Sequence, residues 1–282
     1  MRVGTRMLFI LLPLVFILML AGAGMANQSD EKIYNYVWEF GTDVSFIKYV
    51  EPGLMQEEGM MYGLTASYTY RNKIMLRPEI KGSFGDIDYS SPRSGTINNI
   101  RDYMVETRVL LGYDFDFLRD SLTKNKQVTI TPYVGFGYRY LEDNGSKRWS
   151  SARNWGYNRE AHYIYSPLGL EFFVPINDEW AFGATGEYDF FWKGIQRSYL
   201  SARTVWFNNL VNDQHHGYGV RGSVKLQKRG EKFDVVFEPY IKYWYIHKSD
   251  DTYWTFAGIV IGRGWEPKNH SSECGAKLAI RF

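Results

Sequence analysis

Apolar and polar residues alternate with a period of two along most of the chain, a pattern typical of β-strands whose two faces meet different surroundings. In the segment 102–118, one row of the alternation is apolar and the other carries charges: Tyr103, Val105, Val109, Leu111 and Tyr113 against Glu106, Arg108 and Asp114. Similar alternation defines further segments, and together they are 35–49, 60–71, 74–85, 102–118, 127–141, 160–175, 180–192, 216–228, 232–247 and 271–282. The sequence therefore predicts an all-β fold with ten strands.

The rows are longer than the strands of most soluble sheets, and they are rich in aromatic residues, which make up 17% of the chain. After Leu20 no apolar run approaches the length of a membrane helix, so a helical membrane protein is excluded. Backbone groups in lipid must all be paired within the protein, which requires strands there to close into a ring. We therefore predict a closed antiparallel transmembrane β-barrel of ten strands, with short turns on one side and longer polar loops on the other.

The two ends of the chain point to export and to the bacterial outer membrane. Arg2 and Arg6 precede an apolar run to Leu20 and a small-residue stretch ending at Ala26, which is the order of a cleaved signal peptide. We assign residues 1–26 to the signal peptide and 27–282 to an outer-membrane β-barrel domain. The final amphipathic segment ends on Phe282 and resembles the signal that outer-membrane insertion machinery of Gram-negative bacteria reads.

Composition removes several classes of partner. The formal net charge is +2, which gives no strong attraction to nucleic acid. The single cysteine and the five histidines show no metal-ligand spacing, and no glycine-rich phosphate loop is present, so neither a metal nor a cofactor is expected. The expected surroundings are outer-membrane lipid and lipopolysaccharide, and a specific ligand remains open.

The polar rows of the strands are predicted to line the lumen, where acidic and basic residues nearly balance. In a narrow interior such charges should pair, and the predicted network comprises Glu79, Glu106, Arg108, Arg139, Glu187, Arg221, Glu238 and Lys242. A filled lumen favours a structural or surface-interaction role, and a narrow porin-like channel is the alternative. Four prolines lie within predicted strands and are expected to mark β-bulges, because proline lacks a ladder donor: Pro78, Pro132, Pro167 and Pro239.

Two groups of loop residues could carry a reaction. Asp86 and Asp88 come where the third segment enters a long loop, and Asp213 and His215 come where another long loop enters the eighth segment. A histidine that takes a proton from water while a carboxylate orients it is a general-base arrangement. Asp86-Ile87-Asp88 and Asp213-Gln214-His215 resemble the Asp pair and the Asp-x-His pair of omptins, ten-stranded outer-membrane endopeptidases. The resemblance covers the strand count and these two motifs, and it implies these four residues as a catalytic site.

A broader resemblance covers about half of the chain. The stretches 112–115, 132–140 and 163–169 look like uncharacterised proteobacterial outer-membrane β-barrel proteins, which implies fold and compartment but no activity. Three hypotheses follow: a structural or surface-interaction barrel, a narrow porin-like channel, and an omptin-like endopeptidase. The sequence leaves enzymatic activity undecided and leans against it.

Overall fold

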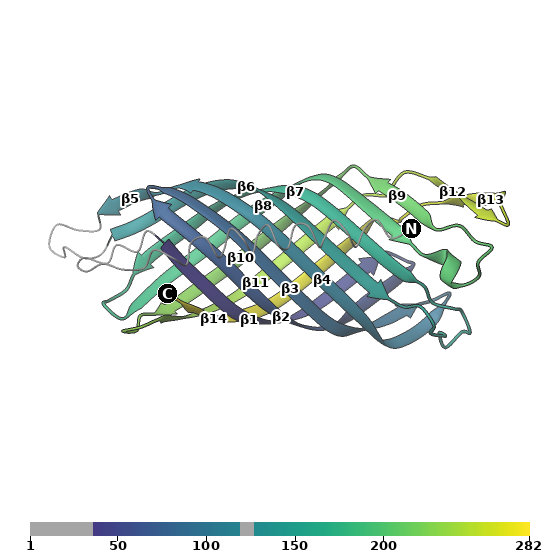
Figure 1. Ribbon diagram of the computed structural model, residues 1–282, viewed down its shortest axis with the longest axis horizontal. Helices are drawn as coiled ribbons and strands as arrows, with labels where there is room; N and C mark the ends of the chain where they lie inside the picture. Colours follow the sequence, from purple (N-terminus) through teal and green to yellow (C-terminus); the bar gives the residue numbers. More distant parts are fainter. Residues whose placement is uncertain (1–35, 119–126) are drawn as a thin grey trace. The chain divides into compact units, whose positions relative to one another are not determined.

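The computed structural model describes residues 36–118 and 127–282, so the predicted signal peptide 1–26 and the predicted turn 119–126 lie outside the described residues. The described chain forms a closed antiparallel barrel (Figure 1). Its wall consists of β1 (Tyr36–Glu51), β2 (Met55–Asn72), β3 (Ile74–Ser91), β4 (Gly95–Tyr113), β6 (Gln127–Asn144), β7 (Asn158–Pro175), β8 (Trp180–Ser198), β10 (Gly217–Lys228), β11 (Asp234–Ile246) and β14 (Asn269–Arg281).

Closure joins the first strand to the last, as predicted. β1 pairs with β2 on one side and with β14 on the other, where Phe46 lies opposite Cys274. β8 pairs with β10, which completes the ring. The ten-stranded barrel expected from the alternation is therefore confirmed.

Short elements extend the wall or leave it. β5 (Phe115–Leu118) continues the line of β4 along β6, and β9 (Leu210–Gln214) continues the line of β10 along β8. β12 (Thr252–Phe256) and β13 (Ile259–Gly264) form a separate hairpin that projects from one end of the barrel (Figure 1). A single 3₁₀ turn, η1 (Leu200–Ala202), lies at that same end, which we call the loop end. The opposite end, where β1 begins and β14 finishes, is the turn end.

The strands run further toward the loop end than the alternation predicted. β3 extends to Ser91 and β4 begins at Gly95, so most of the predicted loop 86–101 is paired sheet. β1 and β2 are likewise joined by residues 52–54 alone. Hydrogen bonds between neighbouring strands stabilise these extensions. The outer faces of the extensions are polar, so the sequence there lacks the apolar row by which the other strand segments were predicted.

The outer surface of the barrel carries an apolar band. Leu111 and Phe237 are 52% and 48% exposed on it, as expected for side chains that meet lipid. Aromatic rings flank the band at the turn end, where the ring centroids of Trp38 and Tyr68 are 4.7 Å apart. Toward the loop end the same outer face becomes charged, with the pairs Lys48–Glu58 and Asp86–Arg101. The apolar band therefore ends before these pairs, and the strand ends beyond them stand outside it.

At Pro78, Pro132 and Pro239 the ladders keep their register without the bulges that were expected, whereas the β7–β8 ladder shifts register between Ile164 and Tyr165, near Pro167. On either side of Pro78, β2 and β3 keep one register, Ser67 with Glu79 and Tyr70 with Leu76, while the pairs between are missing from the ladder. Pro167 and Pro239 sit in similar gaps on one side of their strands. In a long ladder, the loss of one donor therefore opens a local gap, and the neighbouring hydrogen bonds hold the register.

Candidate functional site

The interior is layered, and the layers follow from the inward rows of the strands. Along β4 the inward residues are Glu106, then Met104, then Asp102 toward the loop end. Along β7 they are Tyr165, Tyr163, Ala161 and Arg159. The same order recurs around the wall. A charged layer lies within the barrel, an apolar layer lies above it, and a second charged layer lies at the loop end.

The lower charged layer is an ion-pair network, and its most connected member is Arg221. This guanidinium lies 2.9 Å from Glu106, 2.7 Å from Glu187 and 2.9 Å from Asp189, with each acid side chain at most 5% exposed. The strands β4, β8 and β10 supply these groups, so one cation ties three strands together across the lumen.

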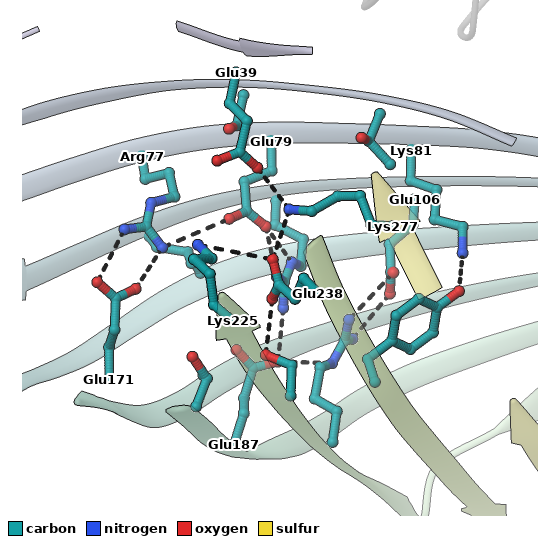
Figure 2. A pocket seen from close by; sticks show the side chains of 18 of the residues that line it. Glu39, Arg77, Glu79, Lys81, Glu106, Glu171, Glu187, Lys225, Glu238 and Lys277 are labelled. Atoms are coloured by element: carbon teal, nitrogen blue, oxygen red, sulfur yellow. Dashed lines mark hydrogen bonds and ion pairs between the residues drawn. The ribbon is translucent and has the colours of Figure 1, made fainter. Parts of the chain in front are cut away.

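Further pairs fill the rest of this layer (Figure 2). Arg77 binds Glu171 at 2.7 Å, and Lys277 lies between Glu39 at 2.6 Å and Glu238 at 2.7 Å. Further contacts in this layer include those of Arg108 with Glu79 and Glu187, Lys81 with Asp43 and Glu273, Lys242 with Glu106, and Lys225 with Glu238. A cavity of about 160 Å³ remains among these charges.

Seven of the eight residues predicted for the lumen network lie in this layer: Glu79, Glu106, Arg108, Glu187, Arg221, Glu238 and Lys242. Arg139 lies higher. It is 2% exposed and its guanidinium carbon is 5.7 Å from the centre of the Trp244 ring, so it belongs with the apolar layer.

The apolar layer consists of two clusters that share the partly buried Leu141. One contains Ala161, Tyr163, Tyr165, Phe191, Trp244 and Ile246, and the other Ile47, Met61, Ile87 and Met104. The buried Tyr165 hydroxyl donates to Glu106 at 2.7 Å and so links the apolar layer to the charges beneath it.

Above the apolar layer the barrel opens into a vestibule at the loop end. Two adjoining cavities of about 470 and 70 Å³ share Glu57, Asp143 and Arg159 in their walls. Glu51 and Glu266 face the larger cavity, and Asp102 faces the smaller one. Glu142 also lines the smaller cavity, and Arg93 and Arg203 also line the larger one, so six carboxyl groups and three guanidinium groups line the two cavities.

Arg159 neutralises only part of this charge. It is 2.7 Å from Glu51, it also contacts Glu266, and its guanidinium carbon lies 5.5 Å from the centre of the Tyr49 ring. Glu57 is 3.9 Å from Arg159, beyond hydrogen-bonding distance. The vestibule therefore carries an excess of acid on the side formed by β2, β4 and β6.

Burial shapes the titration of these acids, which stand beyond the apolar band. Asp102 and Asp143 lie directly opposite each other on β4 and β6. Burial, then repulsion from Glu57, raises the pKa of Asp102 to about 9, and burial, then repulsion from Asp102, raises the pKa of Asp143 to about 7. Burial likewise raises the pKa of Glu266 to about 7 against the opposing attraction of Arg159.

The four residues predicted as a catalytic site all lie on the outer face of the wall. On β3, Asp86 is 2.8 Å from Arg101 and Asp88 accepts a hydrogen bond from the Asn99 backbone, whereas the inward residue between them is Ile87.

The second half of the predicted site is on the other side of the ring. Asp213, on β9, is 3.1 Å from Lys193, and His215, just after β9, is 2.9 Å from Asp250. The strands β4, β6, β7 and β8 separate β3 from β9 along the sheet. The structure does not bring these two pairs together.

The vestibule acids were missed because several of them lie in stretches predicted to be loops, among them Glu51, Glu57 and Asp143. A usable signal was present. Asp102 continues the same inward row as Glu106 and Arg108, so extending the period-two alternation past the apolar residues would have placed it inside the barrel.

No protein-family model matches the chain, and no curated protein matches it. Among solved structures, the outer membrane protease OmpT from Escherichia coli is similar with a TM-score of 0.56 and 8% identity, over 91% of this chain and 99% of that one. Neisserial surface protein A gives a TM-score of 0.31 at 12% identity, over 87% of this chain and 97% of that one. The toluene transporter TodX of Pseudomonas putida gives 0.31 at 11% identity, over 88% and 89%. The likeness to OmpT is one of fold, and this chain has the fold of an outer-membrane β-barrel.

Proposed function

We propose that this protein is an integral outer-membrane barrel that does not conduct and that acts at the cell surface through its vestibule. The observation that carries the proposal is the layering of the interior. A network of ion pairs and an apolar layer fill the lumen, while the largest of the three cavities described above, about 470 Å³, lies at the loop end.

The orientation follows from the ends of the described barrel. β1 begins and β14 finishes at the turn end, and short connections join the strands there, as at the periplasmic side of outer-membrane barrels. The loop end then faces outward from the cell. In this orientation the apolar band meets lipid and the outer charged pairs lie at the level of lipopolysaccharide headgroups. At the turn end of the β1–β14 seam, the ring centroids of Phe282 and Phe40 are 5.9 Å apart. Phe282 is the residue that outer-membrane insertion machinery would recognise.

A surface-interaction role fits this arrangement better than a channel. In the apolar layer the ring centroids of Tyr165 and Trp244 are 5.0 Å apart, and Arg221 lies 2.9 Å from Glu106 in the ion-pair layer beneath them. Both layers are held by buried contacts between strands, so neither can move aside as a loop can.

Single-channel recording in planar lipid bilayers tests the proposal. The refolded protein should give no steady conductance. Gly substitutions of Tyr165 and Trp244 together remove two large rings of the apolar layer and serve as the positive control for a path to the vestibule. Large and steady currents from the unaltered protein would overturn the closed-barrel proposal in favour of the narrow channel.

A further inference from the structure

Around the smaller cavity, four carboxyl groups face the guanidinium of Arg159 alone among the described lining residues. Glu57 is 8% exposed and lines both cavities. Its carboxylate lies 3.9 Å from the guanidinium of Arg159. The Oδ1 atoms of Asp102 and Asp143 are buried without a hydrogen-bond partner among the residues that the structure describes. Three acceptors from three strands therefore converge on the smaller cavity without a full set of donors.

The two cavities differ in what they could hold. The smaller one, of about 70 Å³, has room for a compact cation and a few waters, since one water needs roughly 10–15 Å³ by the same measure. The larger one has aromatic walls that include Trp155, Tyr157 and Trp265. A ligand that uses both would have a small charged head and a longer body that packs on aromatic rings.

We propose that the vestibule binds a primary amine, with its ammonium group in the smaller cavity between Glu57, Asp102 and Asp143 and its body in the larger cavity. This inference rests on the proposed function, because it assigns a ligand class to the same vestibule. An ammonium group has three donors and no acceptor, which matches three carboxyl groups. A guanidinium is planar and wider, and Arg159 already occupies the place where one contacts Glu51 and Glu266.

A metal ion fits less well. Within residues 36–118 and 127–282, no three His, Cys, Asp or Glu side chains are arranged to hold one metal ion. The acids here approach from separate strands around an open space instead of converging on one point. An ammonium bound through hydrogen bonds to separate oxygens tolerates that spacing.

Proton release should accompany binding. Burial, then repulsion from Asp143, raises the pKa of Glu57 well above its ordinary value. With the pKa of Asp143 raised to about 7 and that of Asp102 to about 9, these three acids favour their protonated forms in the empty vestibule. A bound ammonium favours their ionised forms, so amine binding should strengthen as pH rises. The other titratable or charged groups that line these two cavities are Tyr49, Glu51, Tyr89, Arg93, Glu142, Tyr157, Arg159, Tyr163, Arg203 and Glu266.

Calorimetric titration of the refolded full-length barrel in detergent tests the proposal. The probes are 1,4-diaminobutane and Nα-acetyl-lysine amide, which separate a free amine from a lysine side chain as the source of the ammonium. Nα-acetyl-arginine amide, which carries a guanidinium and no amine, and Ca²⁺ are the comparison cations. We expect at least one of the two ammonium probes to bind, and to bind tighter than Nα-acetyl-arginine amide by about tenfold or more.

Neighbouring residues on one strand supply the matched variants. Glu57→Gln alters the inward carboxylate, and Glu58→Gln alters the next residue, which faces outside and pairs with Lys48. Glu57→Gln and Asp102→Asn should each weaken amine binding about tenfold or more, since each removes a charge-assisted hydrogen bond, while Glu58→Gln should not change it. The shift of the folded barrel on an unheated gel confirms folding of each variant.

Two outcomes would overturn the amine proposal. One is binding of neither ammonium probe by folded protein, and the other is binding that Nα-acetyl-arginine amide or Ca²⁺ matches or that Glu57→Gln leaves unchanged. The conductance measurement is independent of these results. A barrel that does not conduct and does not bind amines would support the proposed function and contradict the amine proposal. A conducting barrel would contradict the proposed function itself.

Discussion

Replacing Arg221 by alanine removes the cation that joins three acids in the barrel. Two of them keep another cation: Glu106 retains Lys242 at 3.2 Å, and Glu187 retains Arg108 at 2.7 Å. Asp189 does not, because Arg221 is the only cation within 4.0 Å of it in the described part of the chain. The cost is therefore mainly that of one buried and unpaired carboxylate.

The size of the effect follows from that count. Breaking a buried ion pair from one side costs about 3–5 kcal/mol. The neighbouring cavity of about 160 Å³ admits water, which reduces the penalty, so we expect the unfolding free energy to fall by about 3 kcal/mol. That is a change of more than 100-fold in the folding equilibrium, at about 1.4 kcal/mol per factor of ten.

Urea unfolding of the barrel in lipid vesicles, followed by tryptophan fluorescence, measures this change. Lys48→Ala is the control, since its partner Glu58 is on the outside and an exposed pair contributes only about 0–1 kcal/mol. Adding Asp189→Asn to Arg221→Ala should recover a large part of the loss, because the stranded charge is gone. If Arg221→Ala is as mild as Lys48→Ala, or if Asp189→Asn brings no recovery, the role given to the ion-pair layer is wrong.

Three further predictions concern the outer face, the vestibule and the predicted catalytic residues. Leu111→Arg and Phe237→Arg should each lower the unfolding free energy by roughly 2–4 kcal/mol near the middle of the bilayer, whereas Asn144→Arg at the loop end should change it little. Equal effects at the two kinds of position in the vesicle assay would contradict the assigned faces. In the folded protein the pKa values of Asp143 and Glu266 are about 7, above their ordinary values near 4, so the folded state binds extra protons between these pH values. The unfolding free energy should therefore fall as pH rises from about 4 to 7. A urea midpoint that stays constant across that range would contradict buried neutral acids. Purified barrel with lipopolysaccharide should not cleave peptides, and cleavage lost in both Asp88→Ala and His215→Ala would instead establish the omptin-like hypothesis.

The fold could be predicted from the sequence because the signal for a membrane strand is local. Within the apolar band each strand alternates clearly, as from Tyr103 to Tyr113, and neither register nor partner is needed to see it. The strand ends beyond the band could not be predicted in this way. Their outer residues, such as Glu58 and Asp86, are charged, so both faces are polar and only the pairing with a neighbour reveals a strand.

The candidate site depended on those strand ends. Whether a loop-end residue faces inward changes with a single position, as Glu57 and Glu58 demonstrate. Asp86 and Asp88 were predicted to project from a loop, yet once β3 extends through them their alternation with Ile87 sends both outside. The lumen network was easier to predict, because its members sit in the same rows as clear lipid-facing residues.

The pairing of β1 with β14 has a consequence for how the barrel folds. The seam joins Val50 to His270 and Glu39 to Arg281, contacts that are among the most distant in sequence that the chain can make. Such contacts form slowly, and the strands that await them present unpaired edges prone to aggregation. Until β14 pairs with β1, both strands keep an open edge, so the wall gains its full set of ladder hydrogen bonds only when the last strand is in place.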